Sequence, residues 1–311
     1  MAKKKTPTFS KTIVFQFMVS VVVVKVFGFL NPPFLTAKAE KCEASLDWFD
    51  EAWYDDTQFA KDVNFYLINK TKMGDTKFIN TKLNGKNVLE MTIPSCLIDS
   101  LLEYYKTYVE PFIKEDKYYE FGIPGHEFFG VSPTGWNSDI QWLSVDSISS
   151  YNHLLPYFEH MGLRDIFDSI IDADQKIVVY SIFFVIRSKI PTHKWHVDFT
   201  NTTNVNGFTL LTPLQKKSNI RLAYKDLNGN IQHYEYKKDV GIVFGENFSH
   251  ATDLTRKDQN LEVLFCFSFG TDKLRDWPQL SKTASSQGRH YMSPRTGFYR
   301  NIAYDDVLSK S

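Results

Sequence analysis

A series of short strand-like segments in the second half of the chain constrains the fold most. The segments are rich in β-branched and aromatic residues, which favour strands, and they cover residues 177–186, 208–211, 220–224, 232–236, 241–245 and 261–269. Turn residues separate them, and Asn228-Gly229 between two of them is a strong hairpin signal. Short strands at such close spacing predict a β-sandwich or barrel.

Residues 40–174 have a different character, because apolar residues recur there with helical spacing. This spacing predicts helices at 99–112, 151–158 and 163–171, the first with Asp99 as its N-cap. We therefore expect an α+β chain in four parts. They are a targeting segment (1–39), a region of helices and loops that packs on the core (40–174), the β-rich core (175–272) and a C-terminal tail (273–311).

The composition excludes several classes of protein. The 311 residues carry 36 Lys and Arg against 36 Asp and Glu, so the chain lacks the basic surplus of a nucleic-acid binder. Its three cysteines are too few for a disulfide scaffold, and no Cys-x-x-Cys pattern points to structural zinc. An ordinary globular protein with a sizeable core remains.

The N-terminus has the layout of a targeting signal. Three lysines at 3–5 precede an apolar run at 13–24, which Lys25 ends. A spanning helix needs about 20 apolar residues, so membrane association through this run is the less favoured alternative. Residues 37–39 supply the small-x-small pattern of a cleavage site. The pattern predicts the secretory pathway or, from a loose resemblance of residues 27–33 to the signal-to-transit junction of plastid proteins, a plastid.

Three side chains in the β-rich half form a candidate metal site. His196 and Asp198 are two residues apart, so in an extended segment they point to the same side. His250 follows about fifty residues later, after another strand-like segment. Two histidines and one carboxylate leave coordination positions open, an arrangement that suits non-haem Fe(II). His193 competes with His196 for the ligand role, but it has no acidic residue two positions on.

The stretch from Val179 to Gly270 resembles the double-stranded β-helix, or jelly-roll, core of the Fe(II)/2-oxoglutarate-dependent dioxygenases. His196-Val197-Asp198-Phe199 matches the first two metal ligands of that superfamily, and His250 matches the distal histidine. The segments 207–211 and 241–245 resemble the strands that follow the first ligands and lead to the last. The resemblance implies an oxidoreductase that binds Fe(2+), 2-oxoglutarate and O2, with ascorbate as an optional reductant. Because Asp198 keeps the carboxylate ligand, halogenation is not expected.

The basic residue that should pair with the far carboxylate of 2-oxoglutarate is not at its usual place. The family generally carries it nine or more residues after the distal histidine, yet residues 259–262 include no Arg or Lys. A guanidinium suits the role because its fork matches a carboxylate. We rank Arg256 first, Arg221 second and Arg187 third for this role.

Two further side chains receive expected roles around the site. The hydroxyl of Thr209 could contact 2-oxoglutarate. Asp253 could orient His250 as an outer partner, although a solvated loop position is the simpler interpretation.

The reaction implied is hydroxylation, desaturation or oxidative ring closure of a small molecule, for which an amino-acid-derived specialised metabolite is one example. The expected partners are that substrate and O2, without nucleic acid. Two alternatives stay open. One is a prolyl-hydroxylase-like enzyme that acts on protein, and the other is a cupin-type metal isomerase or lyase that does not use 2-oxoglutarate.

Overall fold

The computed structural model describes residues 88–114, 116–132, 140–168, 170–187, 190–199, 206–215, 221–226, 228–254 and 262–304. The expected targeting segment at 1–39 and the candidate Arg256 lie outside these ranges. None of the helices within them is long and apolar enough to cross a membrane.

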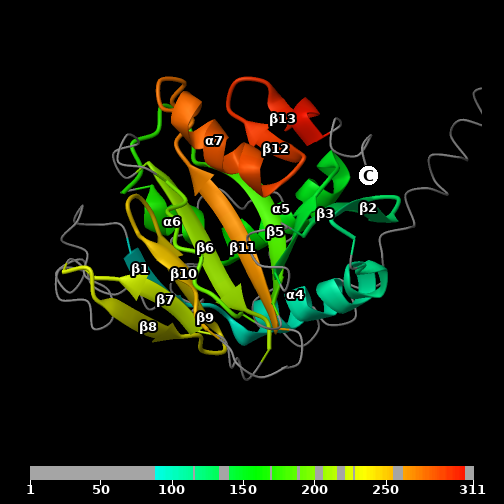
Figure 1. Cartoon of the computed structure of the whole chain (residues 1–311). Helices are drawn as coiled ribbons and strands as arrows, with labels where there is room; N and C mark the ends of the chain where they lie inside the picture. Colours follow the sequence, from blue (N-terminus) through cyan, green and yellow to red (C-terminus); the bar gives the residue numbers. More distant parts are fainter. Residues whose placement is uncertain are drawn as a thin grey trace, which may run out of the picture. The chain divides into compact units, whose positions relative to one another are not determined.

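The β-rich half forms two antiparallel sheets. The larger sheet has the order β9-β6-β11-β5 at its centre, and the smaller has the order β10-β7-β8. The strands are β5 (Val178–Arg187), β6 (Gly207–Pro213), β7 (Arg221–Lys225), β8 (Ile231–Glu235), β9 (Val240–Phe244), β10 (His250–Thr252) and β11 (Glu262–Gly270). Along the chain the strands pass back and forth between the sheets (Figure 1). This is the jelly-roll, or double-stranded β-helix, arrangement, and the predicted fold class is confirmed.

The hairpin predicted from Asn228-Gly229 is present between β7 and β8. The carboxylate of Asp226 accepts hydrogen bonds from the backbone N–H groups of Asn228 and Asn230, both at 2.9 Å. Gly229 has a φ of 80°, a left-handed conformation that glycine adopts without strain. Local turn chemistry therefore fixes the register of β7 against β8, and β10, which carries His250, pairs with β7 on its other side.

The larger sheet extends beyond the predicted core. It includes β1 (Val88–Thr92) on one edge and β4 (Ile140–Val145), β3 (His126–Val131) and β2 (Tyr118–Ile123) on the other. The expectation of only helices and loops at 40–174 was therefore wrong for these four segments. β2 and β3 are rich in aromatic residues and are joined by a Pro124-Gly125 turn, so the sequence does contain the signals of a hairpin at this place.

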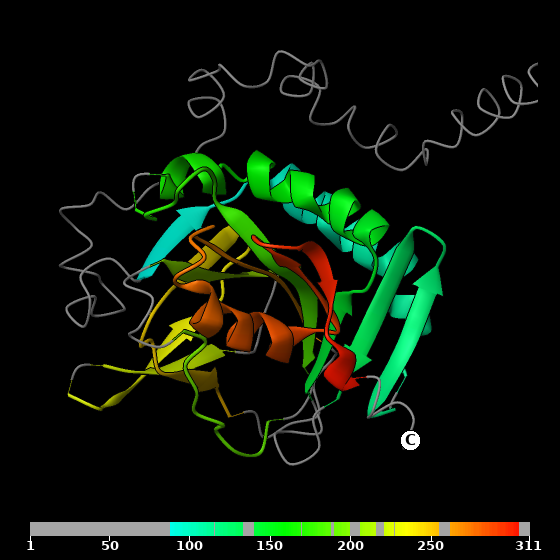
Figure 2. The same ribbon diagram turned by 90° about the horizontal axis from the view of Figure 1, so that it is seen from above.

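Three helices cover the outer face of the larger sheet. They are α4 (Ser95–Tyr108), α5 (Ile148–His160) and α6 (Leu163–Phe167), and α4 and α5 run side by side in Figure 2. All three were predicted, although α4 begins after Pro94 rather than at Asp99. Their aromatic rings meet those of the sheet; Phe158 lies 5.0 Å from Phe269, for example, measured between ring centroids. A short 3-10 turn, η3 (Glu110–Phe112), follows α4.

The opposite, inner face of the larger sheet encloses an apolar core together with the smaller sheet. Its members come from strands of both sheets, and they include Phe183, Val185, Leu211, Tyr224, Tyr234, Tyr236, Ile242, Phe244, Phe248, Leu264 and Cys266. On β5, Phe183 and Val185 face this core, whereas Phe184 between them contacts Tyr105 of α4. The alternation follows directly from the pleat of a strand.

The C-terminal segment, expected as a tail, is folded against the barrel. It comprises α7 (Trp277–Gln287), β12 (His290–Ser293), β13 (Gly297–Arg300) and η4 (Ile302–Tyr304). α7 buries Leu280 and Ala284 against Tyr180 at the start of β5 and against Phe199. The hydroxyl of Thr283 on α7 donates to the backbone carbonyl of Asp198. This helix therefore supports the segment that carries two of the candidate ligands.

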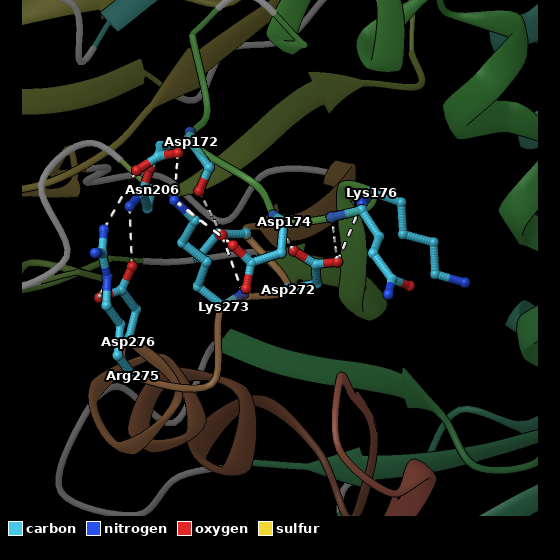
Figure 3. Close-up of polar contacts among 10 residues, drawn as sticks. Asp172, Asp174, Lys176, Asn206, Asp272, Lys273, Arg275 and Asp276 are labelled. Carbon is cyan, nitrogen blue, oxygen red and sulfur yellow. Dashed lines mark hydrogen bonds and ion pairs between the residues drawn. The ribbon is translucent and has the colours of Figure 1, made fainter.

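A carboxylate fixes the start of β5 to the end of β11. Asp272 accepts three backbone N–H groups, those of Asp174, Gln175 and Lys176, at 2.7, 2.9 and 3.0 Å (Figure 3). Its neighbour Thr271 donates from its hydroxyl to the carbonyl of Asp172 at 2.7 Å. Because β5 and β11 are adjacent in the larger sheet, these bonds fix the start of β5 in register with the end of β11.

Acid should destabilise the protein through His126. This residue is 7% exposed; its Nδ1 shares a hydrogen bond of 2.8 Å with the hydroxyl of Tyr104, and its ring stacks on Tyr108. Burial, reinforced by the nearby His153, lowers the pKa of His126 to about 4. In the unfolded chain His126 therefore takes up a proton as the pH falls through about 6.5, whereas in the folded protein it stays neutral down to about pH 4. The free energy of unfolding consequently decreases as the pH drops below about 6.5.

Between pH 7 and pH 5 this difference amounts to about 2 kcal/mol for one histidine. Urea unfolding of wild type and His126→Asn at both pH values measures it, because asparagine can still accept the Tyr104 hydroxyl but does not titrate. The variant should lose about 2 kcal/mol less than wild type over this interval. An equal loss in the two proteins would contradict the assignment.

Candidate metal centre

Backbone pairing brings the two histidines together. His196 forms an isolated antiparallel bridge with His250, in which each backbone N–H donates to the other's carbonyl at 3.0 Å. A residue pair in direct register places both side chains on one face. The two imidazole rings accordingly lie 4.2 Å apart between centroids.

Asp198 completes the cluster from the same segment as His196. Its Oδ1 lies 3.5 Å from Nε2 of His196 and 3.9 Å from Nε2 of His250. One ligand atom from each of the three residues lies within 4.8 Å of the others, so a single ion could contact all three. The convergence predicted from the sequence spacing is therefore present.

Each histidine is oriented by a backbone carbonyl. Nδ1 of His196 contacts the carbonyl of Lys194, and Nδ1 of His250 contacts the carbonyl of Phe248, both at 3.0 Å. A carbonyl can only accept, so Nδ1 carries the proton in each ring and Nε2 carries the lone pair. That is the tautomer a metal needs on the side that faces Asp198.

The carboxylate of Asp198 is oriented in the same way. The hydroxyl of Thr209 on β6 donates to Oδ2 of Asp198 at 2.7 Å, while Oδ1 is the oxygen nearer to both imidazoles. Hydrogen bonding of one oxygen leaves the other for a metal. The contact of Thr209 with 2-oxoglutarate, expected from the sequence, stays a prediction; its observed contact is with the carboxylate.

The site is recessed and its histidine on β10 is neutral. The side chains of His196, Asp198 and His250 are 29%, 13% and 6% exposed, so the cluster opens on the side of His196. Burial lowers the pKa of His250 to about 4, with the proximity of His196 as the next cause. Two imidazoles and one carboxylate, with the correct nitrogen lone pairs available, fit the ligand set of non-haem Fe(II).

Asp253 does not orient His250. Its carboxylate is buried and contacts Nε2 of His193 at 3.1 Å, Nδ1 of His233 at 2.9 Å and Nη2 of Arg221 at 2.7 Å. The expectation that Asp253 orients His250 was wrong, because the carbonyl of Phe248 accepts the hydrogen bond from Nδ1 of His250. The simpler interpretation, a solvated loop position, was wrong as well, since only 4% of the side chain is exposed.

The candidates for the co-substrate anchor lie in different places. Arg256 is outside the described residues. Arg221 pairs with Asp253, and its side chain is 44% exposed. Arg187, ranked third, is buried at the end of β5 on the inner face of the sheet. Tyr236, to which no sequence pattern assigns a role, lies in the same inner core.

No protein-family model and no curated protein matches the chain. Similar folds occur among solved structures. A prolyl-4-hydroxylase from Pseudomonas putida is 11% identical, with 60% of this chain and 92% of that chain covered and a TM-score of 0.38. HygX from Streptomyces hygroscopicus, solved with nickel and 2-oxoglutarate, is 11% identical, with 60% and 83% covered and a TM-score of 0.39.

A third, an oxidoreductase of the 2OG-Fe(II) oxygenase family from Burkholderia pseudomallei, is 9% identical, with 42% of this chain and 68% of that chain covered and a TM-score of 0.34. Identities and TM-scores of this size say nothing about the reaction or the substrate, so any argument about these has to rest on the side chains of this chain. The strand order defines a double-stranded β-helix protein, and three of its side chains form a recessed His-Asp-His cluster.

Proposed function

We propose that the chain is an Fe(II)- and 2-oxoglutarate-dependent oxygenase with His196, Asp198 and His250 as its iron ligands. The observation that carries the proposal is the convergence of these three side chains inside the barrel, within 4.8 Å of one another. The polar partners support it, because two carbonyls and one hydroxyl hold the ligand atoms in the orientation that a metal requires.

When bound, iron(II) with 2-oxoglutarate and O2 would supply an oxidative decarboxylation that yields succinate and CO2. The second oxygen atom would enter a substrate C–H bond or leave as water together with two hydrogens taken from the substrate. The protein's own residues prepare this chemistry. Asp198 offsets one of the two positive charges of the metal, and the two neutral imidazoles hold it on one face. The rings of Phe244 and Phe248 pack against His250 and keep water from that side.

The depth of the site supports a proposal for the substrate class. Asp198 and His250 are recessed, so the bond to be oxidised has to reach into the barrel past His196. A small molecule, such as an amino-acid-derived metabolite, satisfies this most simply. A single side chain of a protein, as a prolyl hydroxylase would bind it, is the alternative. Hydroxylation, desaturation and ring closure share the same protein groups.

The test of the proposed function is succinate formation by the purified protein. Protein reconstituted anaerobically with Fe(II) should release succinate from 2-oxoglutarate once O2 is admitted, at least slowly and without added substrate. Protein loaded with Zn(II), which is redox-inert, should release none. If the Fe(II) protein neither binds 2-oxoglutarate nor forms succinate, a cupin-type isomerase or lyase becomes the better proposal.

For residues 1–39 we propose a targeting role in the secretory pathway or a plastid, on the basis of the basic start and the apolar run. Fusion of residues 1–39 to a fluorescent protein, with Lys3, Lys4 and Lys5 intact or replaced by glutamate, tests it. Diffuse fluorescence from the intact fusion would contradict the proposal.

A further inference from the structure

A buried arginine faces the interior of the barrel. Arg187 ends β5 and is 7% exposed. Strand alternation places it on the same face as Phe183 and Val185, which belong to the inner core. Among the Arg and Lys residues that the structure describes, only Arg187 and Arg289 are buried. Arg289 is paired with Asp146, which leaves Arg187 as the unexplained cation.

The polar atoms around Arg187 lack acceptors. Neither Nε nor Nη1 of Arg187 has a hydrogen-bond partner in the described part of the chain. The hydroxyl of Tyr236 lies in hydrogen-bonding range of the guanidinium, but among the described residues it has no acceptor for its own proton. Burial raises the pKa of Tyr236 to about 12, although the positive charge of Arg187 opposes the rise. The phenol is therefore protonated at neutral pH and can donate. Buried donors without acceptors are rare in native proteins, so this group of donors calls for an anion.

The guanidinium and the candidate metal ligands share one interior. The rings of Phe244 and Phe248 belong to the inner core that Arg187 faces, and they lie 4.5 and 5.5 Å from the ring of His250, measured between centroids. The charge of Arg187 acts on the thiol of Cys266 on β11, a member of the inner core. Glu262 lies opposite Arg187 across β5 and β11.

We propose that Arg187, assisted by the hydroxyl of Tyr236, binds a carboxylate inside the barrel, and that this is the far carboxylate of 2-oxoglutarate. The inference rests on the proposed function. It moves the co-substrate anchor to the first strand of the barrel. Arg221, ranked higher from the sequence, is paired with Asp253 at 2.7 Å and its side chain is 44% exposed.

Two 2-oxo acids of equal length distinguish binding of the far carboxylate by the proposed anchor from chelation of the metal. 2-Oxoglutarate and 2-oxopentanoate share the end that chelates a metal, but only the first has a far carboxylate. Binding of each to the Zn(II)-loaded protein, which cannot turn over, is measured by calorimetry. Wild type should prefer 2-oxoglutarate by at least about tenfold, the contribution expected from a charge-assisted pair.

In Arg187→Met this preference should vanish, while the affinity for 2-oxopentanoate stays as in wild type. Arg187→Lys should keep part of the preference, since it retains the charge without the fork. Tyr236→Phe should lower the preference several-fold. Arg221→Met is the matched rival, because it removes an arginine from the other sheet, and it should keep the full preference.

The melting temperature of the ligand-free protein gives a second readout. An unpaired buried charge opposes folding, and methionine can fill the space of the arginine stem, so Arg187→Met should not lower the melting temperature. Arg289→Met, which breaks a buried pair, should lower it by several degrees. If Arg187 had a purely structural role, Arg187→Met should instead lower the melting temperature.

Three results would overturn the inference alone: an undiminished preference in Arg187→Met, loss of the preference in Arg221→Met instead, or a wild-type protein that binds both acids equally. A fall of several degrees in Arg187→Met with the preference intact would identify a structural arginine. If wild type binds neither acid, the proposed function fails and the inference fails with it.

Discussion

Asp198→Ala should yield a folded protein that retains neither iron(II) nor succinate formation. Asp198 is the only carboxylate in the His-Asp-His cluster, so the change removes one ligand oxygen and the one negative charge that offsets the dication. Loss of an outer partner of a metal ligand typically weakens metal affinity roughly 10–100-fold. Loss of the ligand itself should exceed that range. Iron bound per chain after desalting, together with succinate formed, measures the effect.

Two further variants test whether the loss of iron is specific to Asp198 and its hydrogen-bond partner. Thr209→Val removes the 2.7 Å hydrogen bond to Oδ2 of Asp198 with almost no change of shape, so it should weaken iron binding roughly 10–100-fold. Asp253→Asn alters a carboxylate of similar burial that contacts His193, His233 and Arg221 but none of the three ligands. It should retain iron. Equal loss of iron in Asp253→Asn and Asp198→Ala would show that the cluster is not the metal site.

Two of the three ligands in the metal cluster could be predicted from local signals. The i, i+2 spacing of His196 and Asp198 fixes their common direction once the segment is extended, and the Asn228-Gly229 turn fixes the smaller sheet. His250 is different, because backbone pairing with His196, about fifty residues earlier in the chain, brings it to the site. Its identification from the sequence rested on the resemblance to the dioxygenase core.

The role of Arg187 could not be predicted in the same way. β5 is buried on both faces from Val178 to Arg187, so its sequence has no polar alternation that would show which face looks inward. Only the pairing with β11 and the packing of α4 on Phe184 decide it. Asp253 was misjudged for a similar reason, because its partners come from segments distant in sequence.

The C-terminal segment shows the same limit. Arg289 was one of several basic residues in what the sequence presented as a tail. In the structure its guanidinium makes two contacts with Asp146, which follows β4, and a third with Glu120 of β2. It also lies 5.0 Å above the ring of Phe129. Partners more than 140 residues away leave no local pattern to read.

This pair leads to the largest stability effect that we expect. The side chains of Arg289 and Asp146 are only 6% and 5% exposed, and Nδ1 of His290 adds a contact to Asp146 at 2.7 Å. Asp146→Leu leaves the guanidinium buried without its main partner. Breaking a buried pair in this way costs about 3–5 kcal/mol. In a domain of this size the melting temperature should fall by roughly 6–20 °C.

The double variant Asp146→Leu with Arg289→Met distinguishes a broken pair from a damaged core. Replacing both partners by apolar residues removes the stranded charge, so most of the lost stability should return, and the released Glu120 is exposed enough to be solvated. Lys237→Met is the control, since its ion pair with Glu90 is largely exposed and should contribute less than about 1 kcal/mol. Calorimetric melting of the four proteins measures all of these differences. If the double variant is as unstable as Asp146→Leu, the cost lies in packing around β4 and β12 and not in the isolated charge.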